Sequence, residues 1–188
     1  IFERLNTGGT TLQNQEIRNC IYQGDMNNLL HELNSNTTWR KLYNSTILSP
    51  RLKDEELILR FFAFIDNIDD YSKPLNEFLS KYMAKKKKLS NEEVVYYRDA
   101  FINTINIIDQ KIGLKAFRPS RNLNMAAFDS VMYTIHKYEA NLKSDLSTQI
   151  DELFKNTAYQ NAIRLGTTDE DTIISRIKLA KQYLTNEK

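Results

Sequence analysis

The opening of the chain combines charged side chains with a glycine turn. Arg4 is followed by Asn6, Thr7, Gly8 and Gly9, and helical spacing begins a few residues later. Glycines let the backbone approach a ligand closely, and the N–H groups at the start of a helix point toward an anion. The pattern favours a loop that faces phosphate, with Arg4 to neutralise charge. A plain turn, in which glycine supplies a positive φ before a helix, has the same pattern.

Two basic clusters are candidate contacts to nucleic acid. Lys85, Lys86, Lys87 and Lys88 form the densest run of charge in the chain. Such a run can follow a nucleic-acid backbone with contacts that are independent of sequence and sensitive to salt. It also suits the solvated carboxyl end of a helix.

The second cluster is Arg118 and Arg121, which lie beside Phe117. A mixture of guanidinium and aromatic groups can engage bases or phosphates. The same arginines can equally dock their loop onto the domain.

Other kinds of site find little support. The two histidines, His31 and His136, have no Cys or His at the spacing of zinc ligands, so we expect no metal site. Oxygen ligands between Asp66 and Asp70 could hold a divalent cation, although a polar helix end explains them as well. No nucleophile elbow, Walker loop or dinucleotide fingerprint is present.

Composition points to an ordinary globular chain of 188 residues, with 41% hydrophobic and 27% charged residues. The formal net charge of +2 is too small to indicate nucleic-acid binding, so a local patch would be needed. No apolar run approaches the roughly 20 residues of a membrane-spanning helix, and we expect no membrane partner. The single cysteine, Cys20, fits a reducing compartment, so we expect a cytoplasmic protein.

The spacing of apolar residues predicts a mainly α fold, a multi-helix bundle. The chain has only five glycines and three prolines, and its apolar residues recur at intervals of three and four residues. The expected helices span residues 13–23, 25–33, 39–43, 53–67, 75–83, 91–112, 125–138, 146–154, 159–165 and 169–184. Asp25 and the Ser90–Glu93 capping box predict helix starts, and Gly24 and Gly113 predict stops.

Three expectations concern the core. The segment 53–67 is apolar on more than one face, which predicts the central helix of the domain. Trp39 is expected to be a core anchor. In the first helix, Ile17, Cys20 and Ile21 recur at helical spacing and are expected to face inward.

Three segments also carry a resemblance to a known family. They are residues 2–9 (FERLNTGG) with 15–19 (QEIRN), residues 53–63 (KDEELILRFFA), and residues 128–132 (FDSVM). The first resembles the closing motif of the ParB-like domain of the GmrSD-type restriction family, domain of unknown function 262. The other two resemble the helical part that follows it. An upstream Asp-Gly-Gln-Gln-Arg motif, which the family associates with nucleotide hydrolysis, does not occur in these residues.

The resemblance implies a division of the chain and a set of site residues. Residues 1–24 would be the end of a ParB-like α/β domain, and residues 25–188 a helical domain. Carried over, the opening motif nominates side chains of Arg4, Asn6 and Thr7 and the backbone of Gly8 and Gly9 as nucleotide or phosphate contacts.

Two residues of the first helix join this set. Glu16 would orient the loop or help hold a metal-bound water, and a capping role in the first turn is equally expected. Arg18 would either reach phosphate or pair with Glu3.

For function, the resemblance implies the carboxyl-terminal helical part of a protein of bacterial DNA restriction and anti-phage defence. The complete protein would hydrolyse a nucleoside triphosphate with Mg²⁺ or cleave DNA, with an upstream ParB-like lobe and DNA as partners. This chain alone would bind no cofactor and be inactive. The alternative is a non-catalytic helical module that binds a protein partner or DNA, and a homo-oligomer stays open.

Overall fold

The computed structural model describes residues 11–187, which form ten α-helices and three short 3-10 helices. The α-helices are α1 Asn14–Ile21, α2 Asp25–Asn34, α3 Thr37–Tyr43, α4 Lys53–Asn67, α5 Leu75–Lys85, α6 Asn91–Lys111, α7 Met125–Lys137, α8 Leu146–Lys155, α9 Thr157–Ala162 and α10 Glu170–Leu184. The 3-10 helices are η2 Ile68–Asp70, η3 Gly113–Phe117 and η4 Glu139–Asn141.

The prediction of a mainly α, multi-helix fold is therefore confirmed. Extended pairing within residues 11–187 is limited to one isolated antiparallel bridge, between Leu142 and Thr185. The expected end of an α/β domain is not seen, because residues 1–10 lie outside the described residues and the following segment forms α1. The division of the chain at residue 24 stays a prediction.

Most helix ends follow from local chemistry. Ser90 Oγ accepts the Glu93 N–H at 3.1 Å, and the Glu93 carboxylate accepts the Ser90 N–H at 2.9 Å, so the predicted capping box starts α6. Gly113, with φ of +77°, follows the end of this helix as predicted.

The start of α2 differs from the expectation. Gly24 is its N-cap, and Asp25 is the first helical residue, whose carboxylate accepts the Leu89 N–H at 3.0 Å. A Cβ atom on Gly24 would lie 2.2 Å from the Lys87 carbonyl oxygen. Glycine is therefore required here because the chain passes close to the turn that follows α5.

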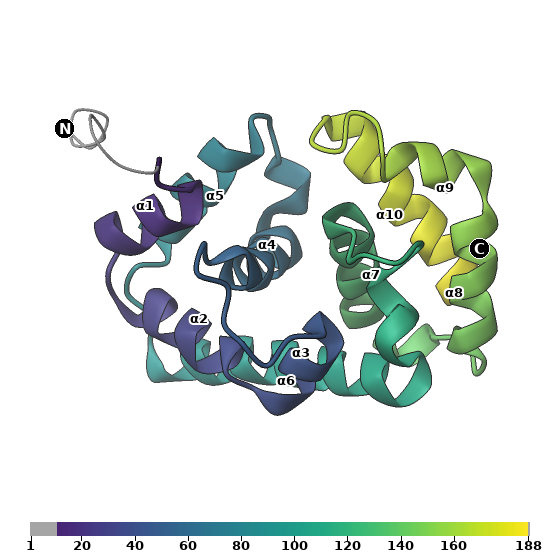
Figure 1. The fold of residues 1–188 in the computed structure, drawn as a ribbon, viewed down its shortest axis with the longest axis horizontal. Helices are drawn as coiled ribbons and strands as arrows, with labels where there is room; N and C mark the ends of the chain where they lie inside the picture. The colour runs from purple at the N-terminus through teal and green to yellow at the C-terminus, as the bar shows by residue number, and fades with distance from the viewer. Residues whose placement is uncertain (1–10, 188) are drawn as a thin grey trace.

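Helix α4 lies at the centre of the molecule, as its apolar sequence predicts. It packs against α1, α2 and α5 on one side and against α7 on the other. Figure 1 shows α1, α2 and α5 on one side of this contact and α8–α10 on the other, with α6 running beneath α4 toward α7. Helix α7 also packs against α10, so α4 and α7 join the two halves.

Trp39 is fully buried in the core, as expected. Its ring makes edge contacts with Phe101 of α6 and Phe128 of α7, at centroid distances of 5.7 and 5.6 Å. Its indole N–H donates to Asn34 Oδ1 at 3.0 Å, so the polar end of the side chain is satisfied.

The expectation for the first helix was wrong. Cys20 and Ile21 are exposed, Ile17 is half-buried, and the buried side chains of α1 are Gln15 and Arg18. Their surroundings explain the reversal, because α1 packs on the first turn of α4, where polar and acidic side chains lie. A polar helix face can be buried when its groups find partners.

A chain of buried charges connects the two halves of the fold. Asp129 of α7 accepts hydrogen bonds from Arg60 of α4, with Nε to Oδ1 at 2.9 Å, and from Arg176 of α10 at 3.0 Å. All three side chains are at least nine-tenths buried. Burial lowers the pKa of Arg60, but the charge and the hydrogen bonds of the Asp129 carboxylate raise it, and the pKa lies above its usual value, so this guanidinium stays charged.

None of the helices within residues 11–187 has the length and the apolar character that crossing a membrane requires.

Candidate functional site

The predicted phosphate loop, Arg4 with Asn6–Gly9, lies outside the described residues. Glu16, from the same set, caps α1: its carboxylate accepts the Gln13 N–H at 2.7 Å and pairs with Arg51 at 3.0 Å. The backbone hydrogen bond is the main cause that lowers the pKa of Glu16. The capping role expected for Glu16 is thus confirmed, and a role toward phosphate stays a prediction.

Arg18 is a buried anchor rather than a free cation. Its guanidinium contacts Glu56 Oε2 at 2.5 Å, Asn76 Oδ1 at 2.7 Å and Gln15 Oε1 at 2.8 Å. The side chain ties α1 to α4 and α5. Burial lowers the pKa of Arg18, and Glu56 opposes that effect. Of the two roles predicted for Arg18, neither is seen within residues 11–187, where its acidic partner is Glu56.

The lysine run begins at Lys85, the last residue of α5, and continues into the turn that leads to α6. Lys86 pairs with Glu93 at 2.9 Å and lies over the Tyr97 ring, 5.3 Å from its centroid. Lys85, Lys87 and Lys88 are exposed. Lys86 is therefore occupied within the fold, and contact of the other three with nucleic acid stays a prediction.

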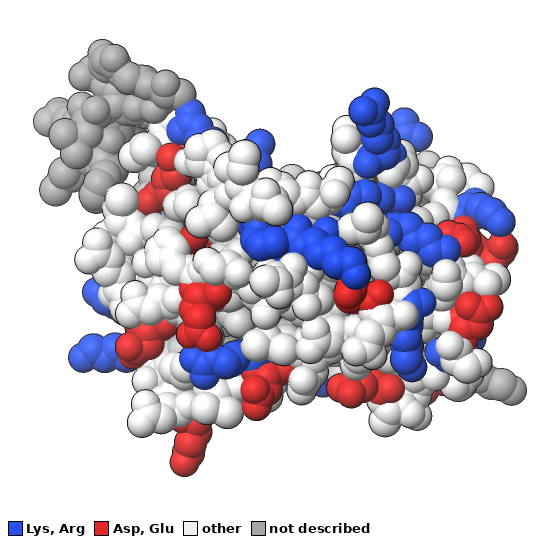
Figure 2. Space-filling view, turned by 60° about the horizontal axis from the view of Figure 1, so that its bottom comes forward, with Lys and Arg blue, Asp and Glu red and all other residues white. Residues whose placement is uncertain are grey.

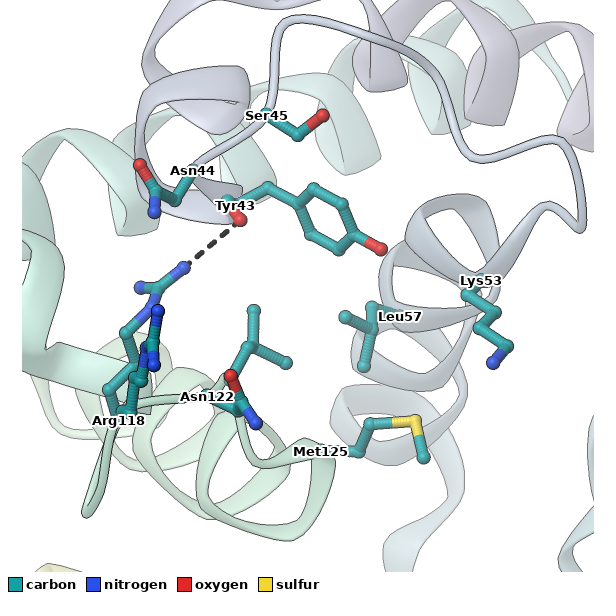
Figure 3. Close-up of a pocket in the computed structure, with 10 residues that line it drawn as sticks. Tyr43, Asn44, Ser45, Lys53, Leu57, Arg118, Asn122 and Met125 are labelled. Atoms are coloured by element: carbon teal, nitrogen blue, oxygen red, sulfur yellow. Dashed lines mark hydrogen bonds between the residues drawn. The ribbon is translucent and has the colours of Figure 1, made fainter.

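The two predicted arginines lie in a cavity of ≈ 440 Å³, which we call the basic cleft. It lies between the loop that joins α3 to α4 and the loop that joins η3 to α7 (Figure 3). The residues that line it are Tyr43, Asn44, Ser45, Lys53, Leu57, Arg118, Arg121, Asn122, Leu123 and Met125. Its charged residues are all cations: Lys53, Arg118 and Arg121.

The α3–α4 wall of the basic cleft is fixed by a buried arginine. Arg40 donates to the carbonyl oxygens of Ser45 and Ile47, both at 2.8 Å, and to Asp54 Oδ2 at 2.8 Å. Asp54 also accepts the Ser49 N–H at 2.8 Å. This network holds the loop in one conformation, and it uses the acid that immediately follows Lys53.

The opposite wall is held by Arg118 and Asn124. The Arg118 guanidinium donates to Leu114 O at 2.6 Å and to Tyr43 O at 3.0 Å, the contact drawn in Figure 3. Asn124 caps α7 by accepting the Ala127 N–H at 2.9 Å. Arg118 therefore docks its loop, one of its two predicted roles, while it also lines the cleft.

The remaining two cations of the cleft are open to a ligand. Arg121 and Lys53 are exposed, and no hydrogen bond or ion pair among residues 11–187 involves either side-chain nitrogen. Figure 3 shows Lys53 across the cavity from Arg118, with the Tyr43 ring between the two walls. Burial lowers the pKa of Arg118 and raises the pKa of Tyr43, so the phenol stays neutral at ordinary pH.

Basic side chains are also unevenly distributed on the surface. Figure 2 shows Lys and Arg gathered across the middle and upper right of one face, with many Asp and Glu below them. A net charge of +2 thus conceals a local concentration of positive charge. Such a concentration attracts polyanions at long range.

The cleft contains residues that the sequence did not single out, among them Tyr43, Asn44, Lys53 and Asn122. They come from the end of α3, the loop after it, the start of α4 and the loop before α7, and no periodic pattern links these segments. Asn44 alone among these four has a local explanation for its place. Its backbone adopts a left-handed φ of +62° at the end of α3, a conformation that asparagine tolerates well.

The chemistry that this arrangement supports is the binding of anions. Guanidinium and ammonium groups supply charge, amides of Asn44 and Asn122 supply hydrogen bonds, and Tyr43 supplies an aromatic edge. Within residues 11–187, no three His, Cys, Asp or Glu side chains are grouped in a way that could hold a metal ion.

Comparison of this chain with protein-family models, curated proteins and solved structures returned no match.

Proposed function

We propose that the chain is the carboxyl-terminal helical part of a ParB-like, GmrSD-type protein of DNA restriction and anti-phage defence, and that its basic cleft holds the phosphate backbone of DNA. The observation that carries the DNA-binding role is the lining of the cleft, which contains Lys53, Arg118 and Arg121 and, among residues 11–187, no acidic side chain. Phosphate contacts of this kind supply affinity without sequence preference.

The resemblance of three sequence segments supports the family proposal. Two of these segments, 53–63 and 128–132, lie in α4 and α7, the helices that join the two halves of the fold. In this proposal the complete protein hydrolyses a nucleoside triphosphate with Mg²⁺ or cleaves DNA. Residues 1–24 contribute one wall of that site, an upstream ParB-like lobe supplies the acid of the absent Asp-Gly-Gln-Gln-Arg motif, and this chain alone is inactive.

A second candidate is a helical module that binds a protein partner and has no chemistry. The observation that favours it is a pair of exposed apolar residues on the α3–α4 loop, Ile47 at 78% and Leu48 at 49% exposure. Adjacent apolar side chains on a surface loop can mark an interaction site. If this candidate is right, the partner binds at these apolar residues and not at the cations of the basic cleft, so added DNA would not displace it.

DNA binding separates the two candidates. We expect the double variant Lys53→Ala/Arg121→Ala to bind a fluorescent DNA duplex roughly tenfold more weakly than the unmodified chain, since each exposed contact contributes on the order of 0.7 kcal/mol. Fluorescence anisotropy at fixed salt gives both affinities. Both side chains are exposed, so the variant should fold normally.

The matched control is Lys137→Ala/Lys178→Ala, which removes the same charge at exposed sites outside the cleft. It should bind DNA as the unmodified chain does. Equal losses of DNA affinity in the two double variants would show that the affinity depends on net charge alone and not on the basic cleft. Binding too weak to measure in all three proteins would favour the second candidate.

A further inference from the structure

A second cavity shares Met125 with the basic cleft. It has a volume of ≈ 220 Å³, and we call it the Arg60 cavity. Its polar lining comprises Arg60 of α4, Asn124 at the start of α7, and Thr167 and Thr168 before α10. Lys53, Leu57 and Arg60 are four and three residues apart, so they lie on one face of α4, and that face borders both cavities.

Arg60 is held rigidly with one edge of its guanidinium free. The side chain is 5% exposed, and Asp129 binds its Nε and Nη2 atoms. No hydrogen bond among residues 11–187 uses Nη1. A planar group fixed on one side and open on the other presents its remaining donors to whatever enters the cavity.

The charge around Arg60 is unbalanced. Asp129 is shared with Arg176, which is fully buried and whose Nε has no hydrogen-bond partner among residues 11–187. Glu56, another acid of α4, is partly exposed and pairs with Arg18. The hydrogen-bonded buried group is therefore two arginines and one carboxylate, and an anion in the cavity would reduce the cost of the excess charge.

The start of α7 adds donors to the same cavity. Met125 and Ala126 are its first two residues, and both line the cavity. Their N–H groups precede the one that Asn124 caps, so the helix itself offers them no acceptor. The positive end of the helix dipole and the backbone N–H groups favour an oxyanion here, and no acidic side chain in the described part of the chain lines the cavity.

Size and depth indicate which oxyanion fits. The Arg60 cavity has half the volume of the basic cleft, ≈ 220 against ≈ 440 Å³, and its arginine is recessed. A recessed cavity accepts the end of a molecule more readily than the middle of a continuous strand. The wider basic cleft beside it has room for the atoms attached to that end.

We propose that the Arg60 cavity binds a terminal phosphate group, a phosphate monoester at the end of a DNA strand whose adjoining nucleotide lies in the basic cleft. This inference rests on the proposed DNA-binding function and deepens it. Free inorganic phosphate shares the same chemistry and is the other source of such a group.

The test compares two short single-stranded oligonucleotides of one sequence, with a 5′-phosphate and with a 5′-hydroxyl. We expect the phosphorylated strand to bind about tenfold more tightly by titration calorimetry, the effect of one charge-assisted contact. Thr168→Glu, which places a carboxylate at an exposed position of the cavity, should abolish this preference. The control Thr148→Glu, an equal charge change on exposed α8, should retain it.

A second variant, Arg60→Lys, keeps the charge but removes the planar group, and should also reduce the preference. In the unmodified chain, the NMR signal of the Arg60 side-chain Nε–H should move only with the phosphorylated strand. If Arg60→Lys does not fold, Thr168→Glu and the NMR signal still decide the question.

The possible failures are distinct. Equal affinity for the two strands, or a preference that survives Thr168→Glu, would overturn the Arg60 inference and leave DNA binding by the basic cleft intact. Thermal stabilisation by inorganic phosphate without binding of either strand would establish the oxyanion site but overturn its strand-end occupant and the proposed DNA function. Stabilisation by phosphate that Thr168→Glu does not change would contradict the site itself.

Discussion

Buried charged side chains define this molecule at the scale of single residues. Arg18, Arg40, Arg60 and Arg176 are all at least nine-tenths buried, and each contacts a carboxylate. Composition alone gives no sign of this, because arginine is usually exposed. Taking charges out of water is costly, and partners in good geometry must offset that cost. These arginines therefore position helices and loops, while Arg121 and Lys53 remain open to a ligand.

Asp129 is the residue on which the largest of these networks depends. We expect Asp129→Ala to lower the free energy of unfolding by about 3–5 kcal/mol, because two buried arginines would lose their shared carboxylate. Urea denaturation followed by circular dichroism measures the change. Asp171→Ala, at an exposed acid on α10, should change stability by less than about 0.5 kcal/mol. A loss at Asp129 no larger than at Asp171 would contradict the structural role given to the network.

At the scale of elements, caps and turns set where the helices begin and end. The longest helix, α6, has 21 residues and starts with the Ser90–Glu93 capping box. Its inner face carries Tyr97, Phe101 and Ile105 into the core beneath Trp39 and α4. The cap is exposed, so its contribution can be measured without disturbing the core.

We expect Ser90→Ala to destabilise the chain by about 1 kcal/mol, since the N–H of Glu93 would lose its side-chain acceptor. The midpoint of urea unfolding should fall with an unchanged slope. Ser144→Ala, at an exposed serine outside the helices, should leave the midpoint unchanged. The same unfolding midpoint for Ser90→Ala and Ser144→Ala would show that the Ser90 cap contributes nothing to stability.

Helices could be predicted from the sequence because their signals are local. The bounds predicted for the helix 53–67 match those of α4. The capping box at Ser90 correctly marked the start of α6. The first helix was mispredicted because its apolar residues suggested a buried Cys20, whereas tertiary contacts of Arg18 buried the polar face. The sequence nominated Arg118 and Arg121 from their types and their place beside Phe117, and both line the basic cleft.

The rest of the site could not be predicted in this way. Tyr43, Lys53 and Arg60 become part of it only because α3, α4 and α7 pack together. Such proximity depends on the tertiary fold and leaves no short-range pattern. The excess charge around Asp129 is equally invisible in a sequence, because it depends on which charges pair.

At the scale of the whole molecule, two helical halves meet along α4 and α7, and both cavities open where they meet. The ion network that joins the halves also supplies Arg60 to one cavity. Stability and anion binding therefore share residues in this account. A ligand that reaches from the basic cleft to Arg60 would contact both halves and stabilise their packing.

The most direct test of the central claim, that the basic cleft holds DNA phosphates, is the salt dependence of DNA binding. The logarithm of the association constant falls linearly with the logarithm of salt concentration, with a slope near −0.9 for each phosphate that the protein neutralises. We predict that Lys53→Ala/Arg121→Ala makes the slope shallower by about 1.8, whereas Lys137→Ala/Lys178→Ala leaves it unchanged. An identical slope in the unmodified chain and both double variants would contradict the account.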